Sequence, residues 1–127
     1  MGYIKKEDQL KILILEDMAN RIEIFKKKLK GHDLYFFDEA DDAIEALRLM
    51  NDKPWDMIFL DHDLGQEMFV PSSHHNTGYT VAKFIAENDV KFNQIIIHSM
   101  NPAGAQNMKS VLKNADVIPF AILRNRL

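Results

Sequence analysis

Three short polar clusters in this sequence carry side chains of the types that bind cations and move protons. They are Glu16-Asp17, then Asp61-His62-Asp63, and finally His98-Ser99-Met100-Asn101. Carboxylates packed together repel one another and raise each other's pKa unless a cation or protons intervene. A hard divalent cation is the simplest solution, with waters and a phosphate oxygen completing its shell. The clusters therefore predict a site for a metal ion and a phosphate.

The predicted metal ligands are the four carboxylates of the first two clusters: Glu16, Asp17, Asp61 and Asp63. Mg2+ is the expected cation, with Mn2+ as the alternative. The chain has no cysteine, so any metal must be held by carboxylates and imidazoles.

The third cluster and the histidines supply the remaining chemistry. Ser99 and Asn101 are expected to donate hydrogen bonds to phosphate oxygens. The expected catalytic residues are Asp61, His62 and His98, because imidazole titrates near neutral pH and either histidine could act as general acid or base. A softer metal bound by a histidine is the alternative.

Each cluster also has a purely structural interpretation. Asp17 could cap a helix, Asp61 and Asp63 could form a turn, and His98 could be a hydrogen-bonded core histidine. For His74 and His75, adjacent in a polar stretch, we favour no metal role. The acidic set stands out because the polar clusters fall at the ends of three predicted strands, all on the same edge of the predicted sheet.

Short apolar runs alternate with amphipathic segments along the chain, and together they must position these clusters. The runs predict strands at 12–15, 34–37, 55–60, 94–98 and 117–118. Helical spacing of apolar residues predicts helices at 17–29, 40–50, from 77 onward, and from Pro102 to about 114. Such alternation implies an α/β fold with a parallel sheet and helices on both faces. Ligands of these sheets bind outside the carboxyl ends of the strands, where all three clusters fall.

Composition limits the classes of function. The chain has 127 residues, 46% hydrophobic and 28% charged, with a net charge of −3. This predicts one domain spanning 1–127 and argues against a general nucleic-acid-binding surface. No apolar run approaches the roughly 20 residues of a membrane span, so we expect a cytoplasmic protein with no membrane partner and no DNA-binding element. The oligomeric state is not predicted.

The strand-end residues resemble the receiver domains of two-component response regulators. The resemblance rests on an apolar strand ending in Glu16-Asp17 and another ending in Asp61, and it extends to about Phe120. It implies a flavodoxin-like, three-layer fold with five parallel strands in the order 2-1-3-4-5. It also implies that the acidic pair holds Mg2+, that Asp61 accepts a phosphoryl group, that Asp63 gives a backbone carbonyl to the metal, and that Ser99 contacts the phosphoryl group.

Two departures separate this chain from signalling receivers. Receivers carry a lysine just after the fifth strand, whereas this chain has Asp116-Val117-Ile118-Pro119-Phe120 and no lysine after Lys113. The charge compensation of an aspartyl phosphate is thereby weakened. Only seven residues follow Phe120, so the last helix is expected to be short or absent.

Three spaced motifs resemble a narrower branch, the cyclic-phosphate-processing receiver domains. They are Leu60-Asp61-His62-Asp63-Leu64-Gly65, Asn76-Thr77-Gly78-Tyr79, and the stretch from His98 to Gly104 followed by Asn107-Met108. The resemblance implies hydrolysis of cyclic phosphates in RNA repair or nucleotide metabolism, with a phosphate-containing small molecule or an RNA end as partner.

Two functional hypotheses follow from these features. The first is a metal-dependent phosphoesterase that opens a cyclic phosphodiester, with Asp61 as metal ligand or covalent nucleophile. The second is a stand-alone atypical receiver that binds Mg2+ and accepts a phosphoryl group on Asp61 as a signalling or binding module.

Overall fold

The computed structural model describes residues 8–127 and shows five strands alternating with five helices. All five strands run parallel in one sheet of order β2-β1-β3-β4-β5. The strands are β1 (Lys11–Leu15), β2 (Asp33–Phe37), β3 (Trp55–Leu60), β4 (Phe92–Ile97) and β5 (Asp116–Val117). The predicted fold class and strand order are confirmed.

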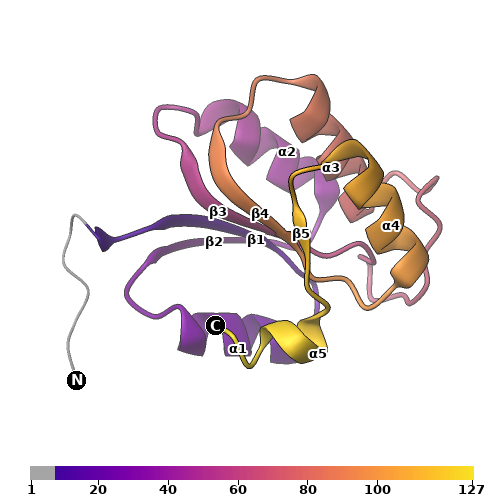
Figure 1. The fold of residues 1–127 in the computed structure, drawn as a ribbon, viewed down its shortest axis with the longest axis horizontal. Helices are drawn as coiled ribbons and strands as arrows, with labels where there is room; N and C mark the ends of the chain where they lie inside the picture. The colour runs from indigo at the N-terminus through magenta and orange to yellow at the C-terminus, as the bar shows by residue number, and fades with distance from the viewer. Residues whose placement is uncertain (1–7) are drawn as a thin grey trace.

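The helices cover both faces of the sheet and make three layers (Figure 1). One face carries α1 (Ala19–Lys28) and α5 (Phe120–Leu123); the other carries α2 (Ala40–Leu49), α3 (Gly78–Glu87) and α4 (Pro102–Val111). The last helix has four residues, which confirms the expectation of a short one. None of the helices in residues 8–127 combines the length and apolar character of a bilayer crossing.

The continuous apolar strand runs arise because each strand packs against helices on both faces. In β1, Leu13 and Leu15 join the core beneath α2, α3 and α4. Ile12 and Ile14 join a second core with Phe25 of α1. The sheet is therefore held from both sides, and its carboxyl edge is fixed relative to α1 and α4.

The first helix begins two residues later than expected, and this changes what Asp17 does. The helix starts at Ala19 after Met18, so Asp17 is not its cap. Glu16 instead accepts hydrogen bonds at Oε2 from the backbone N–H groups of Asp17, at 3.2 Å, and Met18, at 3.1 Å. The capping interpretation of Asp17 is therefore wrong. Its carboxylate instead contacts the loop that follows β3.

Candidate metal and phosphate site

The hydrogen-bond ladder of the sheet continues one residue beyond the strand ends. Leu15, Leu60 and Ile97 are register partners across β1, β3 and β4. The Asp61 N–H then donates to the Leu15 carbonyl at 3.1 Å, and the His98 N–H to the Leu60 carbonyl at 2.9 Å. Since the ladder holds these residues side by side, Glu16, Asp61 and His98 form a single cluster at the edge of the sheet.

Glu16 and His98 are a fully buried pair in this cluster. His98 Nε2 lies 2.9 Å from Glu16 Oε1, and the imidazole packs edge-on against the Phe25 ring. Burial raises the pKa of Glu16, but the hydrogen bond and charge of His98 and the Met18 N–H outweigh it, so the pKa lies below its usual value. Glu16 is therefore ionised at neutral pH with both oxygens occupied.

Asp61 is the carboxylate whose buried negative charge is not fully compensated by its neighbours. Burial raises its pKa to about 7, with the neighbouring Glu16 charge adding to the effect, although His98, the His62 N–H and Arg21 act in the opposite direction. Oδ1 accepts the His62 N–H at 2.8 Å, whereas Oδ2 has an arginine at 3.7 Å. A cation close to such a buried carboxyl group stabilises its ionised form.

Arg21 supplies a cation at this site that the sequence analysis did not identify. Its Nη1 lies 3.7 Å from Asp61 Oδ2 and 3.8 Å from Glu16 Oε1, and the side chain is 17% exposed. The guanidinium also lies over the Phe120 ring, with 5.1 Å from Cζ to the ring centroid. The site therefore has a fixed positive charge despite the missing lysine. In the sequence, its only signal was a place in the first turn of α1, four residues after Asp17.

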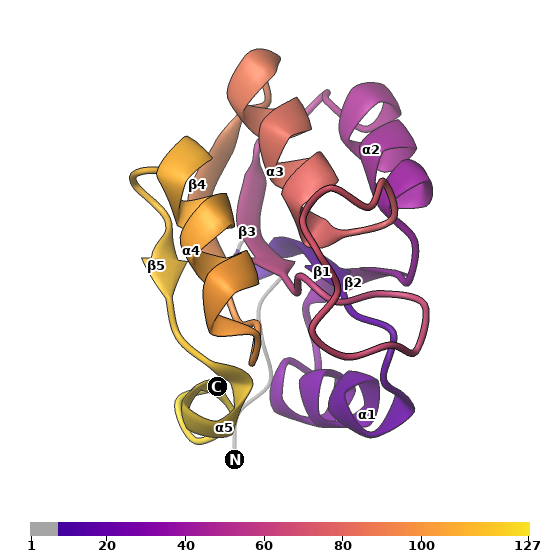
Figure 2. The same ribbon diagram turned by 90° about the vertical axis from the view of Figure 1, so that its right-hand side faces the viewer.

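A pocket of about 250 Å3 opens above this cluster, between α1 and the loop that follows β3. Its polar lining includes Asp17, Arg21, Asp61 and Asp63. Asp17 accepts the backbone N–H of Gln66 at Oδ2, at 2.7 Å, which ties the loop to the acidic pair. Burial raises the pKa of Asp17 and the Glu16 charge adds to this, against the Gln66 hydrogen bond. Figure 2 shows the loop lying across the carboxyl ends of the strands, above α1 and beside α4.

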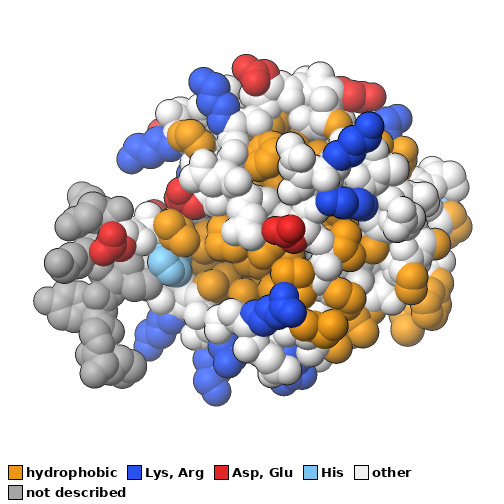
Figure 3. Space-filling model, viewed as in Figure 1, with side chains coloured by type: hydrophobic (Ala, Val, Ile, Leu, Met, Phe, Trp, Pro, Cys, Tyr) orange, Lys and Arg blue, Asp and Glu red, His pale blue; other side chains and the backbone are white. Residues whose placement is uncertain are grey.

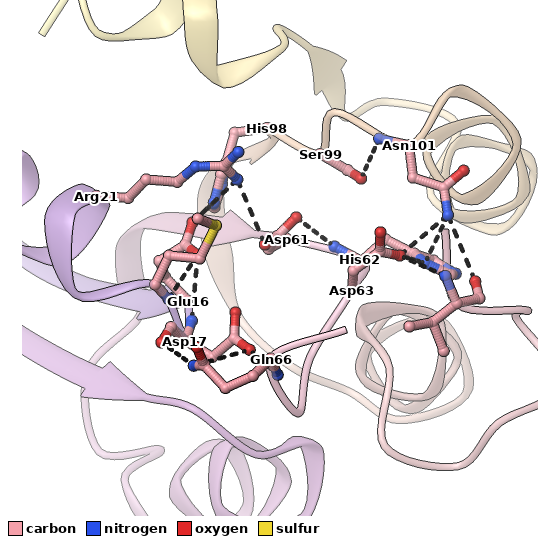
Figure 4. Close-up of polar contacts among 12 residues, drawn as sticks. Glu16, Asp17, Arg21, Asp61, His62, Asp63, Gln66, His98, Ser99 and Asn101 are labelled. Atoms are coloured by element: carbon pink, nitrogen blue, oxygen red, sulfur yellow. Dashed lines mark hydrogen bonds and ion pairs between the residues drawn. The ribbon is translucent and has the colours of Figure 1, made fainter. Parts of the chain in front are cut away.

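His62 and Asp63 form a second polar group, in which Asp63 also borders the pocket. Figure 4 shows the two groups on either side of the β3 end. His62 Nδ1 lies 2.8 Å from Asp63 Oδ1, and its Nε2 lies 2.8 Å from the Ser72 hydroxyl. Asp63 also accepts the Phe69 N–H at Oδ2, at 2.7 Å, and an Asn101 amide N–H at Oδ1, at 3.0 Å. Burial raises the pKa of Asp63, but these hydrogen bonds outweigh it and hold the pKa below its usual value.

Two glycines allow α3 and α4 to approach this end of β3 closely. A Cβ on Gly104 of α4 would lie 2.6 Å from His62 Nδ1, and one on Gly78 of α3 would collide with the Asp61 carbonyl. The Gly78 N–H also donates to the His62 carbonyl at 2.9 Å. The glycines of the Thr77-Gly78 and Ala103-Gly104 motifs are therefore explained by packing against the strand end.

The residues expected to bind phosphate lie beside the pocket. Ser99 is buried, and its Oγ accepts the Asn101 N–H at 3.0 Å. Asn101 caps α4 by accepting the Gly104 N–H at 3.1 Å, and its amide nitrogen donates to Asp63 Oδ1 at 3.0 Å and to the Val70 carbonyl at 3.4 Å. Ser99 lies in a separate groove next to β5. The phosphate contacts of these two residues therefore stay predictions.

The strand-end cluster has the donor types and the spacing of a divalent cation site, with Glu16 Oε1 and His98 Nε2 already bonded to each other and the Asp61 carboxylate nearest the pocket. Within residues 8–127, Glu16, Asp61 and His98 offer one ligand atom each, all within 4.8 Å of one another. Another acidic group, Asp38, Glu39 and Asp42, has the same spacing but is exposed. His75 is exposed and pairs with Asp41 at 2.6 Å, and neither His74 nor His75 joins a metal-ligating group in the described residues.

Comparison with known families decides which receiver branch this is. The family model of the cyclic-phosphate processing receiver domain matches residues 11–114. The chain belongs to this family. The resemblance inferred from the three motifs is thus confirmed. A search of curated proteins finds no match to the chain.

Solved structures of receiver domains share the fold. The signal receiver domain of a protein described as a Luxo repressor from Vibrio parahaemolyticus is 21% identical, with a TM-score of 0.65 over 93% of this chain and 83% of that one. The response regulatory domain of protein mrkE from Klebsiella pneumoniae is 18% identical, with a TM-score of 0.63 over 92% and 88%. The signal receiver domain of a modulated diguanylate cyclase from Desulfovibrio desulfuricans G20 is 20% identical, with a TM-score of 0.59 over 93% and 86%. At these identities the likeness establishes the fold alone.

Proposed function

We propose that this protein is a metal-dependent phosphoesterase that hydrolyses a cyclic phosphate on an RNA end or a free nucleotide. The observation that supports this best is one pocket that combines carboxylates with a fixed cation, Asp17 and Asp61 with Arg21. Carboxylates hold a hard divalent cation, whereas the planar guanidinium matches the oxygens of a phosphate. The name of the family to which the chain belongs points to the same substrate.

Asp17 and Asp61 would hold the cation, with Mg2+ preferred and Mn2+ as the alternative. Glu16, whose oxygens are occupied, would add negative charge beneath them. The side chain of Asp63 is fully hydrogen-bonded, so this residue would contribute its backbone carbonyl, as the receiver resemblance implies. When bound, the cation would polarise a phosphoryl oxygen and lower the pKa of a bound water.

The side chains of the protein would then position the phosphate and transfer the proton. In the reaction, a water oxygen bonds to phosphorus, one ring P–O bond breaks, and a proton ends on the leaving oxygen, which gives a monoester. Arg21 would bind the non-bridging oxygens. His98 contacts Glu16 and His62 contacts Asp63, so proton transfer by either imidazole would pass through its carboxylate partner.

Phosphoryl acceptance by Asp61, as in a signalling receiver, is the second candidate. One observation favours it: Arg21 lies 3.7 Å from Asp61 Oδ2, where it would compensate the charge of an aspartyl phosphate in place of the missing lysine.

One set of assays separates the two candidates. Adenosine 2′,3′-cyclic phosphate and a short RNA with the same end are incubated with Mg2+ or Mn2+, and monoester release is followed chromatographically. We expect release that Asp61→Asn abolishes, while Asp42→Asn, in the exposed acidic group, leaves it unchanged. A stable adduct on Asp61 after incubation with acetyl phosphate, detected by intact mass without hydrolysis of either ester, would favour the signalling candidate.

A further inference from the structure

Large apolar side chains are concentrated at the mouth of the acidic pocket. Of the seven large hydrophobic residues that are exposed in the described part of the chain, four line this pocket. They are Met18, 41% exposed, Met68, 79%, Phe69, 66%, and Met100, 46%. Singly scattered exposed residues need no explanation, but a group around a polar site marks a binding surface. We call these four residues the apolar rim.

The apolar rim comes from three separate segments that converge on one opening. Met18 precedes α1, Met68 and Phe69 lie in the loop between β3 and α3, and Met100 precedes α4. Figure 3 shows hydrophobic side chains gathered at the right-hand edge of the molecule, over that loop and the nearby end of α4. The rim therefore surrounds the pocket whose floor holds Asp17, Asp61 and Arg21.

The loop that carries Phe69 is held in place by the acidic site itself. Phe69 adopts a φ of 54° and Gln66 a φ of 64°, a region that is uncommon for residues other than glycine. Asp63 Oδ2 accepts the Phe69 N–H, and Asp17 Oδ2 accepts the Gln66 N–H, each at 2.7 Å. These charge-assisted bonds offset the cost of the backbone conformation. The exposed aromatic ring is thus fixed next to the carboxylates.

We propose that the apolar rim binds the base of a nucleotide while its phosphate lies on the acidic floor. The proposal rests on the proposed function, because it takes the floor to bind phosphate. The ligand must then carry a flat, weakly polar group close to its phosphate, which describes a nucleoside phosphate. Phe69 offers a face on which any base can stack, and the three thioethers adapt to different ring shapes. The pocket of about 250 Å3 is smaller than the roughly 300 to 1,000 Å3 of sites that enclose a drug-sized ligand, so the base would lie across the rim.

Binding measurements with two esters isolate the contribution of the base. Calorimetry in Mg2+ compares two monoesters that are not hydrolysed further by the proposed reaction, adenosine 3′-phosphate and glycerol 2-phosphate, of which the second has no base. We expect the nucleotide to bind at least about tenfold more tightly, the scale of one stacked base. Phe69→Ala should remove most of this preference without changing glycerol ester binding, and Phe69→Tyr should retain it. Leu49→Ala removes an exposed apolar side chain from the end of α2 and serves as the control.

The outcomes separate this proposal from the proposed function. Equal affinity of the wild-type protein for the two monoesters, together with hydrolysis of adenosine 2′,3′-cyclic phosphate, would overturn the rim proposal and leave the phosphoesterase standing. Tighter binding of the nucleotide, lost in Phe69→Ala but without release of a monoester, would support the rim and refute the phosphoesterase. A trinucleotide ending in the same cyclic phosphate distinguishes an RNA end from a free nucleotide as the source of the bound group.

Discussion

Arg21 should compete with the metal and assist the phosphate, so its removal should change the two affinities in opposite directions. In Arg21→Met the side chain keeps its packing against Phe120 but loses its charge next to Asp61 and Glu16. The metal then meets two carboxylates with no competing cation. Phosphate meets the same carboxylates without the guanidinium.

The magnitude follows from the distances. A pair of unit charges at 3.7 Å interacts by about 4 kcal/mol at an effective dielectric constant of about 20. Desolvation of the ions offsets part of this, and hydrogen bonds to charged groups contribute about 1.5 to 3 kcal/mol net. At about 2 kcal/mol, we expect Mg2+ to bind about 30-fold more tightly and inorganic phosphate, with Mg2+ present, about 30-fold more weakly.

Calorimetric titration of each variant with Mg2+ and then with phosphate measures both changes. The pH should be 8.5, because the pKa of Asp61 is about 7 and loss of Arg21 raises it further. Lys26→Met is the matched control, since Lys26 is on the same helix and pairs with the exposed Glu23. Parallel changes in the two affinities, or no change in either, would refute the role assigned to Arg21.

Three further predictions concern stability. In metal-free protein, Asp61 holds a proton between about pH 4 and pH 7 that the unfolded chain releases, so its contribution to stability falls as the pH rises through this window. Urea unfolding in EDTA should therefore show Asp61→Asn gaining stability over wild type from pH 5 to pH 8, and an equal difference at both pH values would contradict this. Mg2+ should raise the Tm of the wild type, and EDTA should reverse this increase. The Tm of Asp61→Asn should change little with Mg2+; an increase as large as that of the wild type would show that the metal binds elsewhere. Gly104→Ala should lower the free energy of unfolding by about 1 to 3 kcal/mol in the same unfolding assay, because the added methyl group displaces the His62 ring. Ala103→Ser, at an exposed position of the same helix, is the control. Equal stability of the two variants would show that α4 shifts to accommodate the methyl group without cost.

The sequence was sufficient to predict the sheet and the residues at its carboxyl edge. Continuous apolar runs placed the strands, and parallel pairing then brought Glu16, Asp61 and His98 together. The alternation of side chains along β3 could also have predicted which face of the sheet each of these residues takes. Asp61 follows Phe59 by two residues and faces the α1 side, whereas His62 follows Leu60 and packs against Gly104 of α4.

Contacts between distant segments were beyond the sequence pattern. Gln66 and Asp17 are 49 positions apart, and no local signal pairs them. Their hydrogen bond holds the loop at the border of the pocket. Arg21 lies among helical residues whose spacing indicates only a surface position. Its direction toward Asp61 follows from how α1 packs on the sheet, a tertiary property.

The most direct test of the central claim is a 31P NMR time course in water enriched in oxygen-18. The protein, Mg2+ or Mn2+ and adenosine 2′,3′-cyclic phosphate are mixed, and the conversion of the cyclic ester to a monoester is followed. We predict a growing monoester signal shifted by one oxygen-18, and no such signal with Asp61→Asn. A cyclic ester that persists with the wild-type protein, or conversion that continues unchanged in Asp61→Asn, would contradict a phosphoesterase at this site.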